Sequence, residues 1–202
     1  YLIFDTETTG LPKNFDAPIT DVENWPRCVQ LAWQLHESNG SLISRGDFLI
    51  TPDGFNIPYD VERVHGISTA LAQRDGKPLN TVLDAFEDAV AQANFLVGHN
   101  LKFDLNIMGA EFVRANRTNV LESKPVLDTC TEKTAELLKL PGGRSKYKFP
   151  TLSELYNYLF ADSFAEAHNA TADVEATARC FFQLVFIDLF TPDALQISET
   201  EL

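Results

Sequence analysis

The sequence predicts an α/β fold arranged in layers around a mixed β-sheet. Two apolar segments, residues 29–36 and 42–50, flank Ser38-Asn39-Gly40, which is typical of an antiparallel hairpin. From residue 80 onward, helical and strand patterns alternate along the chain. A hairpin followed by such alternation indicates a sheet that contains both antiparallel and parallel strands.

Three further strands are expected besides the hairpin. The opening run Tyr1-Leu2-Ile3-Phe4 is typical of a buried strand that leads into a turn at residues 5–10. Residues 95–97 are apolar and are followed by Gly98, which predicts a second buried strand. A short strand is expected around Val126-Leu127.

Five segments carry a helical pattern. Residues 80–94 place apolar side chains at helical spacing, and a second stripe begins near Leu101. Helices are also expected at residues 130–140, 151–160 and 170–189, with a loop of Pro, Gly and basic residues at 141–150. We expect residues 1–202 to form one domain with a loose tail from about residue 190.

The composition argues against several classes of protein. A net charge of −13 argues against a broad basic face for nucleic acid, so metal ions or a partner would have to offset repulsion from phosphates. Cys28, Cys130 and Cys180 show no paired spacing, which favours free thiols over a disulfide framework or a zinc site. Free thiols suit a reducing compartment, so we expect a cytoplasmic protein, and no apolar run is long enough to span a membrane.

Two acidic residues follow the first apolar run. Asp5 and Glu7 are two residues apart, so the alternation of a strand points both carboxylates to one face. An isolated Asp-x-Glu is more often a solvated turn. Here the strand would carry the pair to the edge of a buried sheet, where two like charges are costly without a cation.

Two later segments add three candidate site residues. Asp104 follows the strand expected at 95–98, and strand ends in open α/β sheets commonly present site residues. Asp173 lies near the start of the last helix. His168 precedes Asp173 by five residues, about 140° around a helix, so we expect it on the preceding loop, from which it could fold over the site. Taken singly, Asp104 would be a helix-dipole Asp and His168 an ordinary loop histidine.

Together these segments resemble the DEDDh family of 3′→5′ exonucleases, which includes proofreading subunits of bacterial replicative polymerases. The resemblance rests on Phe4-Asp5-Thr6-Glu7-Thr8-Thr9-Gly10, on Gly98-His99-Asn100 with Phe103-Asp104, and on His168 with Asp173; Val64-His65-Gly66-Ile67 is similar to another family segment. The related group that uses tyrosine places it four residues before the last Asp, where this chain has Asn169. The stretch between Pro12 and Arg27 and the loop at 141–150 depart from the family pattern.

The resemblance implies a ribonuclease-H-like three-layer fold with a central five-stranded mixed sheet flanked by helices. It also implies two divalent cations, Mg²⁺ or Mn²⁺, which suit oxygen ligands. Asp5 would bridge both ions, Glu7 and Asp173 would complete the first, and Asp104 would hold the second. His168 would accept the proton of the attacking water. The pocket for the terminal nucleotide would be lined by Thr8, Leu11, Val64 and His65.

The expected function is therefore removal of nucleoside 5′-monophosphates from the 3′ ends of single-stranded nucleic acid, with DNA in proofreading or repair as the first choice and a polymerase as a partner. An oligoribonuclease or RNA-trimming enzyme would use the same residues, because DNA and RNA differ at the 2′ hydroxyl. An inactive binding module in a replication assembly is the third reading. The basic and aromatic run Arg144-Ser145-Lys146-Tyr147-Lys148-Phe149 suits either a lip that guides single strands or an ordinary surface loop.

Overall fold

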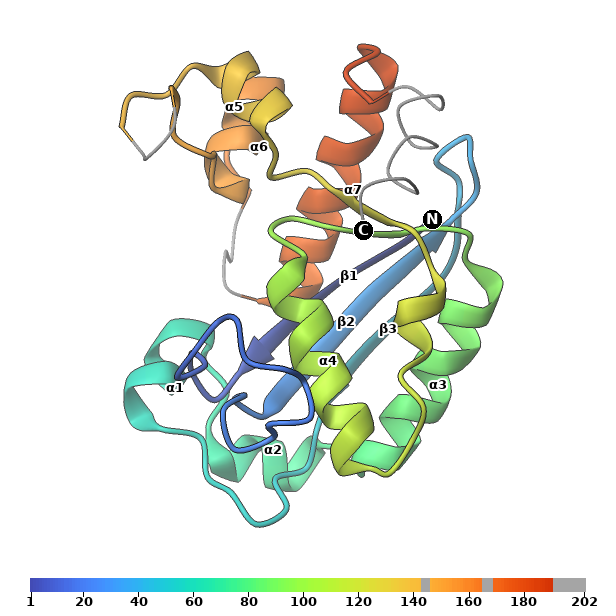
Figure 1. Ribbon diagram of the computed structural model, residues 1–202, viewed down its shortest axis with the longest axis vertical. Helices are drawn as coiled ribbons and strands as arrows, with labels where there is room; N and C mark the ends of the chain where they lie inside the picture. The colour runs from blue at the N-terminus through green and yellow to red at the C-terminus, as the bar shows by residue number, and fades with distance from the viewer. Residues whose placement is uncertain (143–145, 165–168, 191–202) are drawn as a thin grey trace.

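The computed structural model describes residues 1–142, 146–164 and 169–190 (Figure 1). Within these residues, five strands form one mixed sheet in the order β3-β2-β1-β4-β5. The strands are β1 (Leu2–Thr8), β2 (Cys28–His36), β3 (Leu42–Leu49), β4 (Leu96–Gly98) and β5 (Val126–Asp128). β1–β2 and β2–β3 pair antiparallel, whereas β1–β4 and β4–β5 pair parallel. The expected hairpin and mixed sheet are both confirmed.

The central strand β1 extends further than its apolar residues suggest. It continues through Asp5 to Thr8 because β2 supplies antiparallel pairing along its whole length, from Leu2 opposite Leu35 to Thr8 opposite Cys28. The turn expected at residues 5–10 therefore begins only after Thr8. Asp5 and Glu7 are thus strand residues.

Helices cover both faces of the sheet (Figure 1). Leu2 and Phe4 point to one face, where they pack with side chains of α3 (Leu79–Gln92) and α4 (Lys102–Arg114). Ile3 points to the other face and packs with α7 (Ala170–Phe186). The alternation of β1 thus separates two apolar layers and produces the three-layer arrangement.

A third apolar cluster extends the α7 side of the molecule. Helices α5 (Glu132–Leu138) and α6 (Leu152–Phe160) lie beside α7 (Figure 1), and Leu155 and Tyr156 of α6 pack on Cys180 and Leu184. Thr151 and Glu154 form a capping box that begins α6. This cluster fixes the start of α6 near the end of the sheet.

Two short helices between β3 and α3 were not expected. α1 (Tyr59–His65) ends at Gly66, whose φ of 77° lies in the left-handed region that glycine adopts readily. α2 (Thr69–Asp75) begins at Ser68, whose side chain accepts a hydrogen bond from the Leu71 amide. Each helix has seven residues, too few to display a clear apolar stripe.

Several element ends differ from the sequence expectation. The helix expected at 130–140 is α5, which starts later because Thr131 caps it and ends where Lys139 turns left-handed. The last helix ends at Phe186 rather than near residue 189. A 3-10 turn (Val120–Ser123) precedes β5. None of the described helices combines the length and apolarity that a membrane span requires.

Candidate active site

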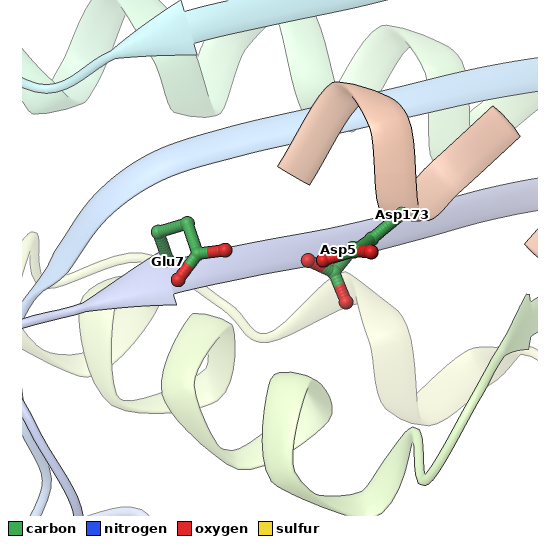
Figure 2. A group of neighbouring side chains, drawn as sticks. All are labelled: Asp5, Glu7 and Asp173. Atoms are coloured by element: carbon green, nitrogen blue, oxygen red, sulfur yellow. The ribbon is translucent and has the colours of Figure 1, made fainter. Parts of the chain in front are cut away.

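Three carboxylates from two elements meet on the central strand of the sheet. Asp5 and Glu7 project from β1 to the face covered by α7, and Asp173 projects from the first turn of α7. One oxygen from each residue lies within 4.8 Å of the other two. Figure 2 shows the carboxylates of Asp5 and Asp173 side by side, with Glu7 further along the strand and turned toward them. This spacing suits a single bound cation.

The start of α7 explains the position of Asp173. The Asn169 side chain accepts hydrogen bonds from the amides of Thr171 and Ala172, so Asn169 is the N-cap of the helix. Ala170 and Val174 pack against Ile3 and the neighbouring strands. Asn169 therefore begins α7. The packing of Ala170 and Val174 holds the first turn against β1, which places Asp173 near Asp5 and Glu7.

Asp104 approaches the same site from the other face of the sheet. It lies in the first turn of α4 and is 4% exposed. Its Oδ1 accepts hydrogen bonds from the Thr6 amide at 3.0 Å and from the Thr6 hydroxyl at 2.6 Å. Thr6 stands between Asp5 and Glu7 and faces α4, so it connects the fourth carboxylate to the strand that carries the first two. The sequence reasoning missed Thr6, although strand alternation places it on the α4 face.

Three of the four carboxylates have raised pKa values. Burial, together with the charges of Asp173 and Asp104, raises the pKa of Glu7 to about 8. Burial and the same neighbours raise the pKa of Asp5 well above its ordinary value. Burial raises the pKa of Asp104 to about 7, although the hydrogen bonds from Thr6 oppose this shift. Buried acids whose pKa values are raised in this way are typical of a metal centre or a catalytic site.

A cavity of about 710 Å³ opens beside these carboxylates. Its lining includes Asp5, Asp104 and Asp173. It also includes residues that precede and begin α6, among them Phe149, Pro150 and Thr151. The cavity therefore joins the acidic cluster to a wall that contains an aromatic side chain.

The turn at the end of β4 is built by residues next to the acidic cluster. The Asp128 carboxylate accepts hydrogen bonds from the amides of Asn100, Leu101 and Cys130 at 2.7–2.9 Å. These bonds hold Asn100 in its left-handed conformation, with φ of 60°, and fix the start of α4. Asn100 of the Gly98-His99-Asn100 segment therefore shapes this turn. Asp128 was missed, although an acid directly after a strand was a usable signal.

The four residues expected to line the nucleotide pocket fall into two kinds. Leu11 and Val64 are 75% and 54% exposed, so neither belongs to the core. Thr8 and His65 are buried: the Thr8 hydroxyl donates to the Gly10 carbonyl, and His65 Nδ1 accepts from the Ile67 amide. Burial lowers the pKa of His65, and the nearby Thr8 backbone opposes the shift. The structure thus brings Thr8 and His65 together near the end of β1.

Two expectations concern residues outside the described part of the chain. His168, the expected proton acceptor, and Arg144 of the expected lip both lie there. Within the described part of the loop, Lys148 forms an ion pair with Glu154 at 2.6 Å, so this cation is engaged by the start of α6. The three cysteines are free thiols, as expected.

Comparison with known proteins places this geometry in a family. Residues 2–181 match the model of the RNase T exonuclease family. The chain belongs to this exonuclease family. The resemblance to DEDD exonucleases of the ribonuclease-H-like superfamily is thereby confirmed, while the histidine subtype depends on His168 and stays a prediction.

Similar proteins include polymerases and a nuclease. Two PolC-type DNA polymerases III of Streptococcus pyogenes, from serotypes M2 and M18, are each 32% identical over 182 residues. That alignment covers 90% of this chain and 11% of each polymerase. E. coli exonuclease I in complex with a dA16 oligonucleotide superimposes with a TM-score of 0.71 at 18% identity, over 97% of this chain and 42% of that chain. Another exonuclease I structure gives 0.73 at 19% identity, with the same coverage. These superpositions confirm the fold.

Proposed function

We propose that this chain is a divalent-metal-dependent 3′→5′ exonuclease that releases nucleoside 5′-monophosphates from single-stranded DNA ends. The observation that carries the proposal is the convergence of Asp5, Glu7 and Asp173, whose oxygens lie within 4.8 Å of one another inside an exonuclease-family fold. Such a cluster is electrostatically unfavourable unless cations neutralise it.

The donor set fits hard cations such as Mg²⁺ or Mn²⁺. All four acids offer oxygen, and no nitrogen or sulfur ligand joins the described cluster. Asp5, Glu7 and Asp173 would hold one ion, and Asp104 with Asp5 would hold the second. Bound ions would lower the pKa of a water nucleophile and stabilise the charge that develops on the leaving oxygen.

The protein's own residues would orient the reaction. Thr6 directs the carboxylate of Asp104 toward the site through two hydrogen bonds. His168 would accept the proton of the attacking water, because an imidazole titrates near neutral pH. We propose that the exposed side chains of Leu11 and Val64, with the buried Thr8 and His65, would receive the terminal nucleotide.

The choice of single-stranded DNA has two supports. The relatives at 32% identity are DNA polymerases, and the fold relatives include a nuclease bound to DNA oligonucleotides. The net charge of −13 disfavours a broad grip on duplex phosphates and favours recognition confined to the cavity. We propose proofreading or repair beside a polymerase as the setting.

A single degradation assay tests this proposal. A single strand labelled at its 3′ terminus should release labelled 5′-mononucleotide first, whereas a 5′-labelled strand should shorten stepwise from the other end. Excess chelator should abolish both reactions, and Mg²⁺ or Mn²⁺ should restore them. Activity that persists in chelator, or rapid cutting of circular single-stranded DNA, would rule the proposal out.

Parallel substrates separate the competing functions. An RNA strand of the same sequence that is degraded much faster than DNA would identify an oligoribonuclease or RNA-trimming enzyme. Binding of either strand without any hydrolysis in Mn²⁺ would identify an inactive binding module. Asp88→Asn, which changes an exposed acid on α3, is the matched control for handling of the protein.

A further inference from the structure

The lining of the cavity includes a half-exposed aromatic ring that has no role in the cluster of acids. Phe149 is 45% exposed and lines the same cavity as Asp5, Asp104 and Asp173. A large apolar side chain left half in solvent loses the free energy that burial would contribute. Exposure alone is common for surface side chains, but this ring lines the cavity that contains the proposed site for a nucleic acid strand, where a flat apolar surface could stack on it.

The backbone on both sides of Phe149 is anchored. Lys148 forms an ion pair with Glu154 through Nζ, at 2.6 Å and 2.8 Å to the two carboxylate oxygens. The Thr151 amide donates to Glu154 Oε2 at 2.8 Å, and the Glu154 amide donates to the Thr151 hydroxyl at 3.2 Å. One carboxylate thus fixes the residues before and after the Phe149-Pro150 pair, and α6 behind it packs on α7.

His99 fixes the same pair from the side of the sheet. Its Nε2 lies 2.9 Å from the Pro150 carbonyl, and its Nδ1 lies 2.8 Å from the Thr129 hydroxyl. A carbonyl only accepts, so Nε2 carries the proton and donates to Pro150. The Cys130 thiol also donates to this carbonyl, at 3.6 Å. His99 therefore links the end of β4, next to the start of α4, to the wall that carries Phe149.

We propose that Phe149 is a stacking platform for a base of the bound single strand, held in register with the acidic cluster by His99. Phe149 and the acids line one cavity, so a strand whose terminal nucleotide lies at the acids would bring an upstream base to the ring. A ring on an anchored backbone loses little conformational entropy when a base stacks on it. Stacking on an aromatic ring is tolerant of sequence, which suits an enzyme that removes successive nucleotides.

This inference rests on the proposed exonuclease function, and a substrate series distinguishes the two. The substrates are 12-nucleotide single strands labelled at the 3′ terminus, either intact or with one abasic nucleotide at the second, third, fourth or fifth position from that end. Release of the terminal nucleotide in Mn²⁺ gives kcat/KM for each. Parallel DNA and RNA series identify which strand uses the platform. No release from any strand would defeat the exonuclease proposal itself.

Phe149→Ala should reduce kcat/KM on the intact strand by about fivefold or more, from the ~1–3 kcal/mol reported for base–aromatic stacking. The parent should show a similar loss at one abasic position, and Phe149→Ala should show no additional loss there. Phe149→Trp should stay within about twofold of the parent. Tyr158→Ala removes a ring of similar exposure on α6 that does not line the cavity, and it should leave every value unchanged.

His99 is tested as a positioning residue. His99→Ala should raise KM on the intact strand more than it lowers kcat, and its effect should shrink on the abasic strand that lacks the stacked base. His99→Gln keeps an N–H donor for Pro150 and should recover part of the loss. Equal losses on intact and abasic strands would instead assign His99 to the chemical step and overturn the linkage.

The platform is refuted by either of two results. One is kcat/KM for Phe149→Ala within twofold of the parent on the intact strand. The other is a loss of kcat/KM for Phe149→Ala that adds to the loss caused by each abasic position. Removing the ring and removing the base that stacks on it abolish the same interaction, so their effects should not add at the stacked position. Should Phe149→Ala fail to fold by its thermal unfolding transition, Phe149→Leu keeps apolar bulk without a ring and must show the same pattern.

Discussion

Asp5 occupies the centre of the acidic cluster. Asp104, Asp173 and Glu7 all act on its carboxyl group, which is also strongly desolvated. Neutralising this residue would remove the ligand that both proposed metal positions share. Each of the other three acids has a share in one proposed position only. A comparison between Asp5 and the proposed proton acceptor therefore tests the assignment of roles.

Asp5→Ala should abolish measurable turnover and remove most Mn²⁺ binding. His168→Ala should lower kcat by ~10²–10⁴, the contribution typical of a general base, and should keep Mn²⁺ affinity within a few fold of the parent. Initial rates on a single-stranded oligonucleotide and calorimetric titration with Mn²⁺ give the two readouts. Lost Mn²⁺ binding in His168→Ala, or full turnover in Asp5→Ala, would reverse these roles.

At the level of residues, the acidic side chains were easier to predict from the sequence than the residues that hydrogen-bond to them. Asp5, Glu7 and Asp173 were predictable as a group because strand alternation, the order of motifs and the cost of like charges all agreed. Thr6 as the partner of Asp104 was not, because its hydrogen bonds join residues 98 positions apart and need the packed fold. Family motifs identify residues that do chemistry, whereas their supports depend on three-dimensional contact.

Helix α4 is held at its far end by a buried charged group. Glu111 Oε1 accepts from Arg27 at 2.9 Å, from Arg114 at 3.0 Å and from the Cys28 amide at 2.9 Å, and its side chain is 1% exposed. Arg114 also donates to the carbonyls of Val22 and Trp25. The stretch between Pro12 and Arg27, which departs from the family pattern, is therefore anchored to the helix that carries Asp104.

Glu111→Ala should lower the free energy of unfolding by roughly 3–5 kcal/mol, because it leaves two partly buried guanidinium groups without their carboxylate. Glu87→Ala is the matched control: its carboxylate is 29% exposed and lies 3.7 Å from Arg117, so the expected loss is below about 1 kcal/mol. Urea unfolding of both variants gives the comparison. A cost for Glu111→Ala no larger than that of the control would contradict this account of α4.

Elements were predictable in proportion to their length and periodicity. α3 was expected at residues 80–94 and spans Leu79–Gln92, since five of its apolar side chains repeat at helical spacing. α1 and α2 were missed because seven residues show no full repeat, and their ends depend on Gly66 and on the Ser68 cap. Asp5 and Glu7 were expected at the end of the first strand, and pairing with β2 continues β1 through both of them to Thr8.

For the whole molecule, the acidic composition has a local consequence. A chain of net charge −13 folds so that four acids from β1, α4 and α7 border one site. The fold class and the meeting of these acids could be predicted from motif order. The part of the lining formed by residues 149–153 could not, because its place in the same cavity as the acids depends on α6 packing against α7 and on the hydrogen bond from His99 to Pro150.

The acidic cluster makes the stability of the metal-free protein depend on pH. The folded-state pKa of Glu7 is about 8 and that of Asp104 about 7, both above the ordinary values of 4.5 and 3.8. The folded protein therefore binds more protons than the unfolded chain between about pH 4 and pH 8. These two groups therefore lower the free energy of unfolding as pH rises through that window. Their full contribution to stability is present only below about pH 4, where both are protonated.

Divalent metal should reverse this loss, because it binds the deprotonated carboxylates and displaces their protons. Saturating Mn²⁺ should raise the thermal unfolding midpoint more at pH 8 than at pH 5.5, and calorimetry in two buffers of different ionisation enthalpy should detect proton release. In Glu7→Gln the difference between the two pH values should shrink, since one titrating group is gone. Asp88→Asn lies on the exposed face of α3 and should behave as the parent. Equal metal stabilisation at both pH values would mean that cations do not bind at these carboxylates, because ligands that must lose protons cannot bind metal independently of pH.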